Sequence, residues 1–170
     1  MKIRERALAI FFALVFVIVP LTACGGDKGG AELASGADLN DLAKTIRQEI
    51  EFDDKDLDTL DEKLQSRYVN QVDFENVKSA IVVAGGGFIA EEILLFEAKD
   101  KDAASKVKSN IQDRFNYFKD SFGNYTPEQL ANLEDPVLIM NGNYVFSVIC
   151  KDNAKAKDVV NEWIKAKTKA

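Results

Sequence analysis

Two hairpins with tight turns are the feature that most narrows the possible folds of this chain. Four segments have the apolar, β-branched composition of strands and occur as two pairs: residues 79–84, 91–98, 137–140 and 144–150. Gly85-Gly86-Gly87 follows the first of these strands, and Asn141-Gly142 joins the second pair as a strong hairpin signal. Strands joined by such short connections run antiparallel, which excludes a doubly wound parallel sheet. We therefore expect one four-stranded antiparallel sheet made of two hairpins.

Helical patterns surround these hairpins and set the fold class. Five segments have helical spacing or a helix-start signal: residues 38–50, 57–68, 104–122, 126–133 and 154–167. The longest of them carries Phe115, Phe118 and Phe122 on one apolar stripe and is expected to end at Gly123. The resulting order, α-α-β-β-α-α-β-β-α, indicates an α+β fold with helices packed mainly on one face. We expect the long helix and the last helix, which contains Trp163, to share that face.

The N-terminus has the organisation of an export signal. Lys2, Arg4 and Arg6 precede an uncharged apolar run over residues 7–19, and Leu21-Thr22-Ala23-Cys24 comes next. A transmembrane anchor is the weaker interpretation, because a permanent span requires roughly 20 apolar residues. The tetrapeptide looks like the lipobox of a bacterial lipoprotein.

That resemblance implies transfer of diacylglycerol to the Cys24 sulfur and cleavage before this residue. Residues 1–23 would then be a signal peptide, and the glycine-rich residues 24–37 a flexible lipidated tether. Residues 38–170 would form a single α+β domain. We expect the mature protein to be held by its lipid on the extracytoplasmic face of the cell membrane.

Charge and histidine content exclude several functions. Loss of residues 1–23 removes three basic residues and one acidic residue, and so changes the formal net charge from −6 to −8. Nucleic acid is therefore not an expected partner, because neutralising phosphates requires clustered Lys and Arg. The chain contains no His, which removes Ser-His-Asp and Cys-His catalysis. Cys150 ends an apolar run and is interpreted as a buried hydrophobic residue rather than a nucleophile.

Several short features follow one another along the middle of the chain. They are Gly85-Gly86-Gly87 before Ala90-Glu91-Glu92-Ile93, Arg114 on the long helix, Phe122, Tyr125, Thr126-Pro127, Leu133 and Asn141-Gly142-Asn143-Tyr144-Val145. In their order and spacing they resemble the DUF4358 domain, which occurs in predicted lipoproteins of clostridial and related Gram-positive bacteria. The resemblance covers about residues 57–151. The function of that family is uncharacterised, so the resemblance implies a location and domain limits but no reaction.

The acidic run over residues 53–62 has two interpretations. Asp54, Asp56 and Asp58 occupy the first, third and fifth positions of an EF-hand loop. The sixth position is Thr59 instead of Gly, and the twelfth is Gln65 instead of Glu. We therefore favour the solvated start of an acidic helix and keep a weak calcium site as the alternative.

Two glutamates beside the glycine turn are candidates for a polar site. Glu91 and Glu92 are neighbours on a strand and point to opposite faces, so they cannot act together as a catalytic pair. Arg114 lies on the flank of the apolar stripe of the long helix. We expect it to pair with one of the two glutamates, with contact to a ligand as the alternative.

Aromatic residues suggest where a partner binds. Phe88, Tyr125 and Tyr144 would form a binding platform if they gathered at the sheet edge, although Phe residues on a helical stripe are usually core. The candidate contact residues are therefore Gly85, Gly86, Gly87, Phe88, Glu91, Glu92, Arg114, Tyr125 and Tyr144. No catalytic residue, metal ligand or cofactor is indicated.

The sequence favours a non-enzymatic lipoprotein that binds an envelope protein or a cell-wall component. A module that captures a small solute and a carboxylate-based envelope hydrolase are the alternatives. The hydrolase would need two acidic residues facing each other at about 5–10 Å in a cleft. The sequence offers no convincing pair.

Overall fold

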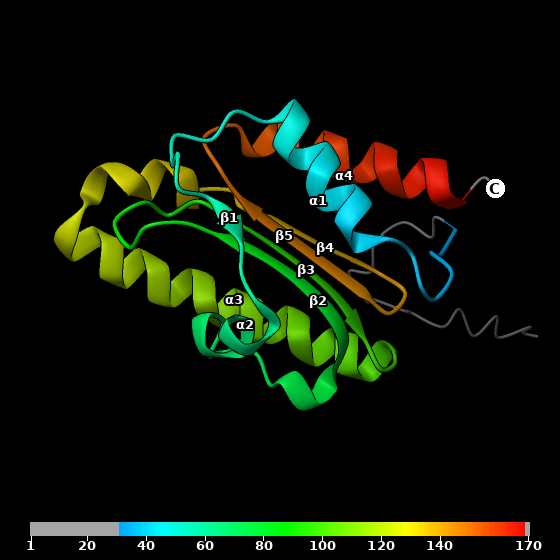
Figure 1. The fold of residues 1–170 in the computed structure, drawn as a ribbon. Helices are drawn as coiled ribbons and strands as arrows, with labels where there is room; N and C mark the ends of the chain where they lie inside the picture. The colour runs from blue at the N-terminus through cyan, green and yellow to red at the C-terminus, as the bar shows by residue number, and fades with distance from the viewer. Residues whose placement is uncertain (1–30, 169–170) are drawn as a thin grey trace, which may run out of the picture. The chain divides into compact units, whose positions relative to one another are not determined.

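The computed structural model describes residues 31–168. The predicted signal peptide, the lipobox and Cys24 lie outside these residues. Figure 1 gives the arrangement of helices and strands in the described part. No helix within it is long and apolar enough to cross a membrane.

The centre of the fold is a five-stranded antiparallel sheet in the order β1-β2-β3-β5-β4. The strands are β1 (Asp58–Thr59), β2 (Val77–Ala84), β3 (Glu92–Ala98), β4 (Val137–Asn141) and β5 (Tyr144–Ile149). Both predicted hairpins, β2–β3 and β4–β5, are confirmed, and they join through β3 and β5. The expected count of four strands is wrong, because the short strand β1 adds a fifth strand at the edge of the sheet.

Strand β1 replaces the first part of a predicted helix. The helix α2 covers only Glu62–Tyr68, whereas Asp58 and Thr59 pair with the end of β2. The prediction failed because Leu57 and Leu60 are three residues apart, a spacing that also suits a helix. In an extended chain this spacing places the two side chains on opposite faces. Leu57 accordingly packs in one core and Leu60 against the other.

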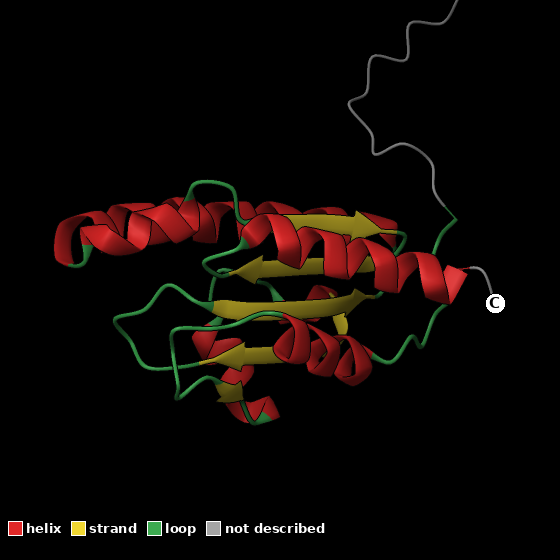
Figure 2. Cartoon of the chain, turned by 90° about the horizontal axis from the view of Figure 1, so that it is seen from above, coloured by secondary structure: helices red, strands yellow, loops and turns green. Residues whose placement is uncertain are grey.

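Helices cover both faces of the sheet, as Figures 1 and 2 show. The helices α1 (Leu39–Glu49) and α4 (Asn153–Thr168) pack on one face, and α3 (Lys101–Tyr125) packs with α2 on the other. The expectation that the long helix and the Trp163 helix share a face is therefore wrong. The reason lies in β3, where all seven residues are buried and apolar side chains face both ways. Such a central strand requires cover on each side.

The predicted start of α1 is confirmed, whereas the later helices differ from the prediction at their ends or in type. Asp38 caps α1 as expected, with its carboxylate accepting from the backbone of Asn40 and Asp41. The long helix continues past Gly123 to Tyr125, where a cap at Gly123 was expected. The segment after it, Pro127–Leu133 (η2), is a 3-10 helix, as is Phe74–Asn76 (η1). The Gln129 side chain accepts a hydrogen bond from the Ala90 backbone instead of completing a capping box.

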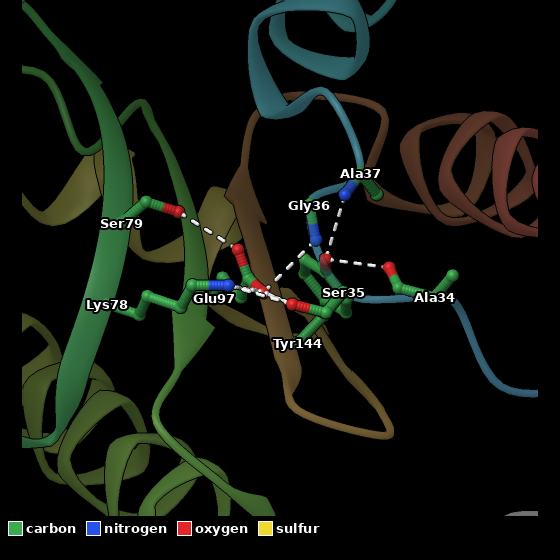
Figure 3. A network of polar contacts seen from close by, with 8 residues as sticks. All are labelled: Ala34, Ser35, Gly36, Ala37, Lys78, Ser79, Glu97 and Tyr144. Atoms are coloured by element: carbon green, nitrogen blue, oxygen red, sulfur yellow. Dashed lines mark hydrogen bonds and ion pairs between the residues drawn. The ribbon is translucent and has the colours of Figure 1, made fainter.

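Residues 31–37, which we call the strap, lie against the edge of the domain where β3 ends. Tyr144 joins two of its residues, because its hydroxyl donates to the Ala34 carbonyl and accepts from the Ala37 amide, both at 2.9 Å. The buried Glu97 carboxylate accepts from the Ser35 hydroxyl at 2.8 Å, as Figure 3 shows. Residues 31–37, which the sequence placed in the tether, are thus held against the domain by these contacts. Residues 24–30 of the expected tether lie outside the described part.

Candidate functional site

A groove with a cavity of about 310 Å³ lies between the loop after β2 and the second half of α3. We call residues 85–89 the glycine loop and the cavity the α3 groove. Tyr68 at the end of α2, Asn70 and Gln71 also line it, as does Thr126 after α3. The groove therefore combines segments that are far apart in the sequence and lie on the same face of the sheet.

The base of the groove is an ion pair between the sheet and the long helix. Arg114 Nη2 lies 2.7 Å from Glu92 Oε2, and Arg114 Nε donates to Glu92 Oε1 at 2.9 Å. Neither side chain is more than 2% exposed. The predicted contact of Arg114 with one of the two glutamates is therefore confirmed, and the partner is Glu92.

Further contacts hold the guanidinium of Arg114 in one position. Its Nη1 donates to the Tyr68 carbonyl at 3.1 Å and to Gln71 Oε1 at 2.9 Å. Its planar face lies between the rings of Tyr68 and Phe118, 4.8 and 4.3 Å from their centroids. Burial alone would lower the pKa of Arg114, but the carboxylate of Glu92 outweighs burial and raises it. Arg114 therefore stays charged, and its charge is neutralised by Glu92.

Glu91 does not face the groove. Its Oε2 accepts a hydrogen bond from the Asp54 backbone at 2.8 Å, whereas its Oε1 is buried and has no partner among the described residues. Burial, followed by the nearby charges of Asp53 and Asp54, raises the pKa of Glu91. The two neighbouring glutamates thus have opposite environments, one paired with a cation and the other beside two acids. This difference follows from the alternation of side chains along a strand.

Asp54 fixes the conformation of the glycine loop. Its carboxylate is buried and accepts from the Gly86 amide at 3.0 Å and from the Asp56 amide at 2.9 Å. A Cβ atom at Gly85 would lie 1.7 Å from Asp54 Oδ2, so only glycine permits this approach. The interpretation of Asp54 as part of a solvated acidic helix start is therefore wrong. Within residues 31–168, no cluster of three or more His, Cys, Asp or Glu side chains could hold a metal ion.

Exposed aromatic side chains surround the opening of the groove. Phe88 from the glycine loop is 76% exposed, and Tyr125 at the end of α3 is 82% exposed. Tyr117 is also exposed, and these three residues form what we call the aromatic rim. Phe118 and Phe122 line the interior and pack edge to face with their centroids 5.3 Å apart.

Tyr144 does not belong to this site, although the sequence grouped it with Phe88 and Tyr125. Its side chain is fully buried on the opposite face of the sheet, where its ring stacks on Phe146. Its hydroxyl holds the strap, as described above. Tyr144 is separated from Phe88 and Tyr125 because it begins β5 and pairs with Glu97, at the end of the sheet away from the glycine loop.

Sequence reasoning missed several polar residues of the groove, namely Asn70, Gln71, Tyr117, Ser121 and Thr126. A signal for some of them was present on the long helix. Tyr117, Ser121 and Tyr125 are spaced four apart and so share one helical face beside the predicted apolar stripe. Thr126 had been assigned as a helix cap, but its hydroxyl makes no capping bond. Its Oγ1 is buried and lacks a partner in the described part of the chain.

Cys150 has the environment that its position in an apolar run predicted. The thiol is fully buried and free, and burial raises its pKa to about 11. A thiol with so high a pKa carries almost no thiolate at neutral pH and is a poor nucleophile. Cys150 also lies outside the groove.

Comparison with known protein families gives one match, described as "Domain of unknown function (DUF4358)", over residues 48–150. No curated protein and no solved structure matches the chain significantly. The matched segment is more than half of the chain, and it contains every residue that lines the groove. The strap lies outside it. On this match, the chain belongs to the DUF4358 family.

Proposed function

We propose that this protein is a lipid-anchored, extracytoplasmic binding module of the cell envelope and that the α3 groove is its binding site. The observation that carries the proposal is the aromatic rim, in which three large side chains remain exposed around a cavity with a rigid base. Exposed aromatic residues at a concave site are characteristic of ligand recognition, because they bury a large area at a small entropic cost. The ion pair below them supplies rigidity rather than a reactive group.

The position of the strap supports anchoring through Cys24. The strap contacts Glu97 near the end of β3, whereas the glycine loop precedes the start of the same strand. At about 3.3 Å per residue, these two ends of β3 are separated by roughly 17 Å. The described chain therefore starts near the end of the sheet away from the groove, and an anchor at Cys24 would join the domain at that end. The two ends are seen at opposite sides of Figure 1.

Capture of a small solute is the second candidate, because about 310 Å³ lies at the lower end of the roughly 300–1,000 Å³ of small-molecule sites. A carboxylate-based hydrolase has less support. No Asp or Glu side chain lines the groove within the described residues. Glu92, the nearest acid on β3, is held by Arg114.

The proposal is tested by sedimentation of the full chain, purified in mild detergent, with isolated cell-envelope material. We expect Phe88→Ala and Tyr125→Ala each to weaken binding about tenfold, which corresponds to about 1.4 kcal/mol. Leu64→Ala is the matched control, because Leu64 is an exposed apolar residue outside the groove. Equal binding by the two rim variants and the wild type would contradict the assignment of the groove.

A further inference from the structure

We infer that the ligand of the α3 groove is an uncharged sugar chain. This inference rests on the proposed function of the groove and adds the chemical class of its ligand. Three properties of the lining residues carry it: the absence of a free charge, the exposed aromatic faces and the uncharged polar side chains. Each property is taken in turn below.

The groove offers no net charge to a ligand. Arg114 is the single charged residue among the described lining residues, and Glu92 neutralises it at 2.7 Å. Most Arg114 donors also have partners, since Nε and one N–H of Nη2 bind Glu92 and Nη1 binds Tyr68 and Gln71. A cationic ligand would find no carboxylate in the lining. An anionic ligand would also be repelled by the chain as a whole, which carries a formal net charge of −6.

The aromatic rim suits the shape of a sugar ring. A pyranose has flat faces of C–H groups, which pack on aromatic rings, and hydroxyl groups around its edge. Phe88 and Tyr125 expose their rings from two different segments, so a sugar chain that crosses the opening would contact both. Aromatic residues provide such a contact without a charge and with few rotatable bonds.

Polar groups inside the groove suit the edge of the same ring. The Thr126 side chain lines the groove, but its Oγ1 is buried and unpartnered in the described part of the chain and is not itself exposed to a ligand. Asn70 adds an amide and Ser121 a hydroxyl to the lining. These groups both donate and accept hydrogen bonds, as sugar hydroxyls do.

The size of the cavity limits how much of a ligand it holds. About 310 Å³ is near the lower limit for a drug-sized molecule and admits roughly one or two sugar rings. The rim residues are exposed at the opening, so the remainder of a sugar chain can continue outside. The geometry therefore suits one segment of a polymer better than a completely enclosed solute.

The test is calorimetric titration of the full chain in a detergent without a sugar headgroup, because such a headgroup would compete. The probes are uncharged tetrasaccharides, one of N-acetylglucosamine and one of glucose, with inorganic polyphosphate and a proline-rich peptide as competing classes. We expect binding of at least one tetrasaccharide that changes little between low and high salt. Tyr125→Ala and Phe88→Ala should each weaken this binding about tenfold. Ser121→Ala should also weaken it, and Leu64→Ala should leave it unchanged.

Absence of tetrasaccharide binding would overturn the inference. If envelope sedimentation still depended on Phe88 and Tyr125, the proposed function would stand and only the ligand class would fall. If sedimentation were also independent of these residues, the proposed function and the ligand class would both be wrong. Salt-dependent binding of polyphosphate at the groove, or binding of the peptide that requires Phe88, would assign the site to another ligand and likewise overturn the inference.

Discussion

The carboxylate of Glu92 and the guanidinium of Arg114 form a fully buried ion pair, with Oε2 and Nη2 2.7 Å apart. The pair joins the central strand β3 to the long helix α3, and Arg114 is one of the residues that line the groove. Two charges at this depth are tolerated because each satisfies the other and Arg114 has further acceptors. The relationship therefore links the stability of the domain to the shape of its groove.

Removal of either partner alone should strongly destabilise the domain. We expect Arg114→Met and Glu92→Gln each to lower the free energy of unfolding by about 3–5 kcal/mol, because the remaining group is left buried and unpaired. Urea denaturation of the two single variants and the double variant measures the coupling. A coupling below about 0.5 kcal/mol would show that the pair does not act as a unit.

Glu91→Gln should have the opposite effect at neutral pH. Burial raises the pKa of Glu91, so the folded state holds this proton more tightly than the unfolded chain does. The stability gained from this tighter proton binding is complete below the ordinary Glu pKa of about 4.3. It is lost as the pH rises through the raised pKa of Glu91 in the folded state. Replacing Glu91 by Gln should therefore stabilise the protein at pH 7, on the order of 1 kcal/mol.

The pH dependence shows whether the stabilisation by Glu91→Gln comes from removing the ionised carboxylate. In urea denaturation the stabilisation by Glu91→Gln should disappear below about pH 4, where the glutamate is protonated in both states. Glu92→Gln is the adjacent control and should destabilise at pH 7. A Glu91→Gln variant that is less stable than the wild type at pH 7 would mean that the ionised carboxylate is favourable in its site.

Gly85→Ala should disrupt the glycine loop, whereas Gly86→Ala should not. A Cβ at Gly85 would meet Asp54 Oδ2 at 1.7 Å, but nothing lies within 4 Å of a Cβ at Gly86. We expect the first substitution to cost about 1–3 kcal/mol, because the buried carboxylate must move. The second should change stability by less than about 0.5 kcal/mol. Thermal unfolding of the matched pair decides this, and equal stabilities would refute the close approach.

Tyr144→Phe should loosen the strap without disturbing the core. The substitution removes the hydroxyl that bridges Ala34 and Ala37 and keeps the ring that stacks on Phe146. We expect a loss of about 1 kcal/mol and faster hydrogen exchange at the Ala37 amide. Tyr125→Phe, which removes an exposed hydroxyl, is the control. Unchanged exchange at Ala37 would show that other contacts alone hold the strap.

Cys24→Ala should abolish lipid attachment and leave the fold intact. Cys24 lies outside the described residues and, in the sequence, outside every segment with helix or strand periodicity. Labelled fatty acid should be incorporated into the wild-type chain and not into the variant, and the variant should leave the detergent phase. Thermal unfolding should be the same for both. Acylation of the variant would remove the basis for the proposed anchor.

Local patterns in the sequence were sufficient for several parts of the structure. Both hairpins, the Asp38 cap and the burial of Cys150 follow from turn residues, short-range periodicity and apolar runs. The pairing of Arg114 with a glutamate was also predictable. A buried cation on the flank of an apolar helix needs a carboxylate, and the glycine turn offered two.

The tertiary structure decided what depends on contacts between distant segments. The run Ile93-Leu94-Leu95-Phe96 is apolar at every position, and only the packed fold shows that α1 and α4 cover one face and α3 the other. Tyr144 was separated from Phe88 and Tyr125 in the same way, because the sheet register places it at the opposite end. Local patterns pointed to single sides of the groove, but the complete groove and the strap are made by segments that meet only when the sheet and its helices have packed.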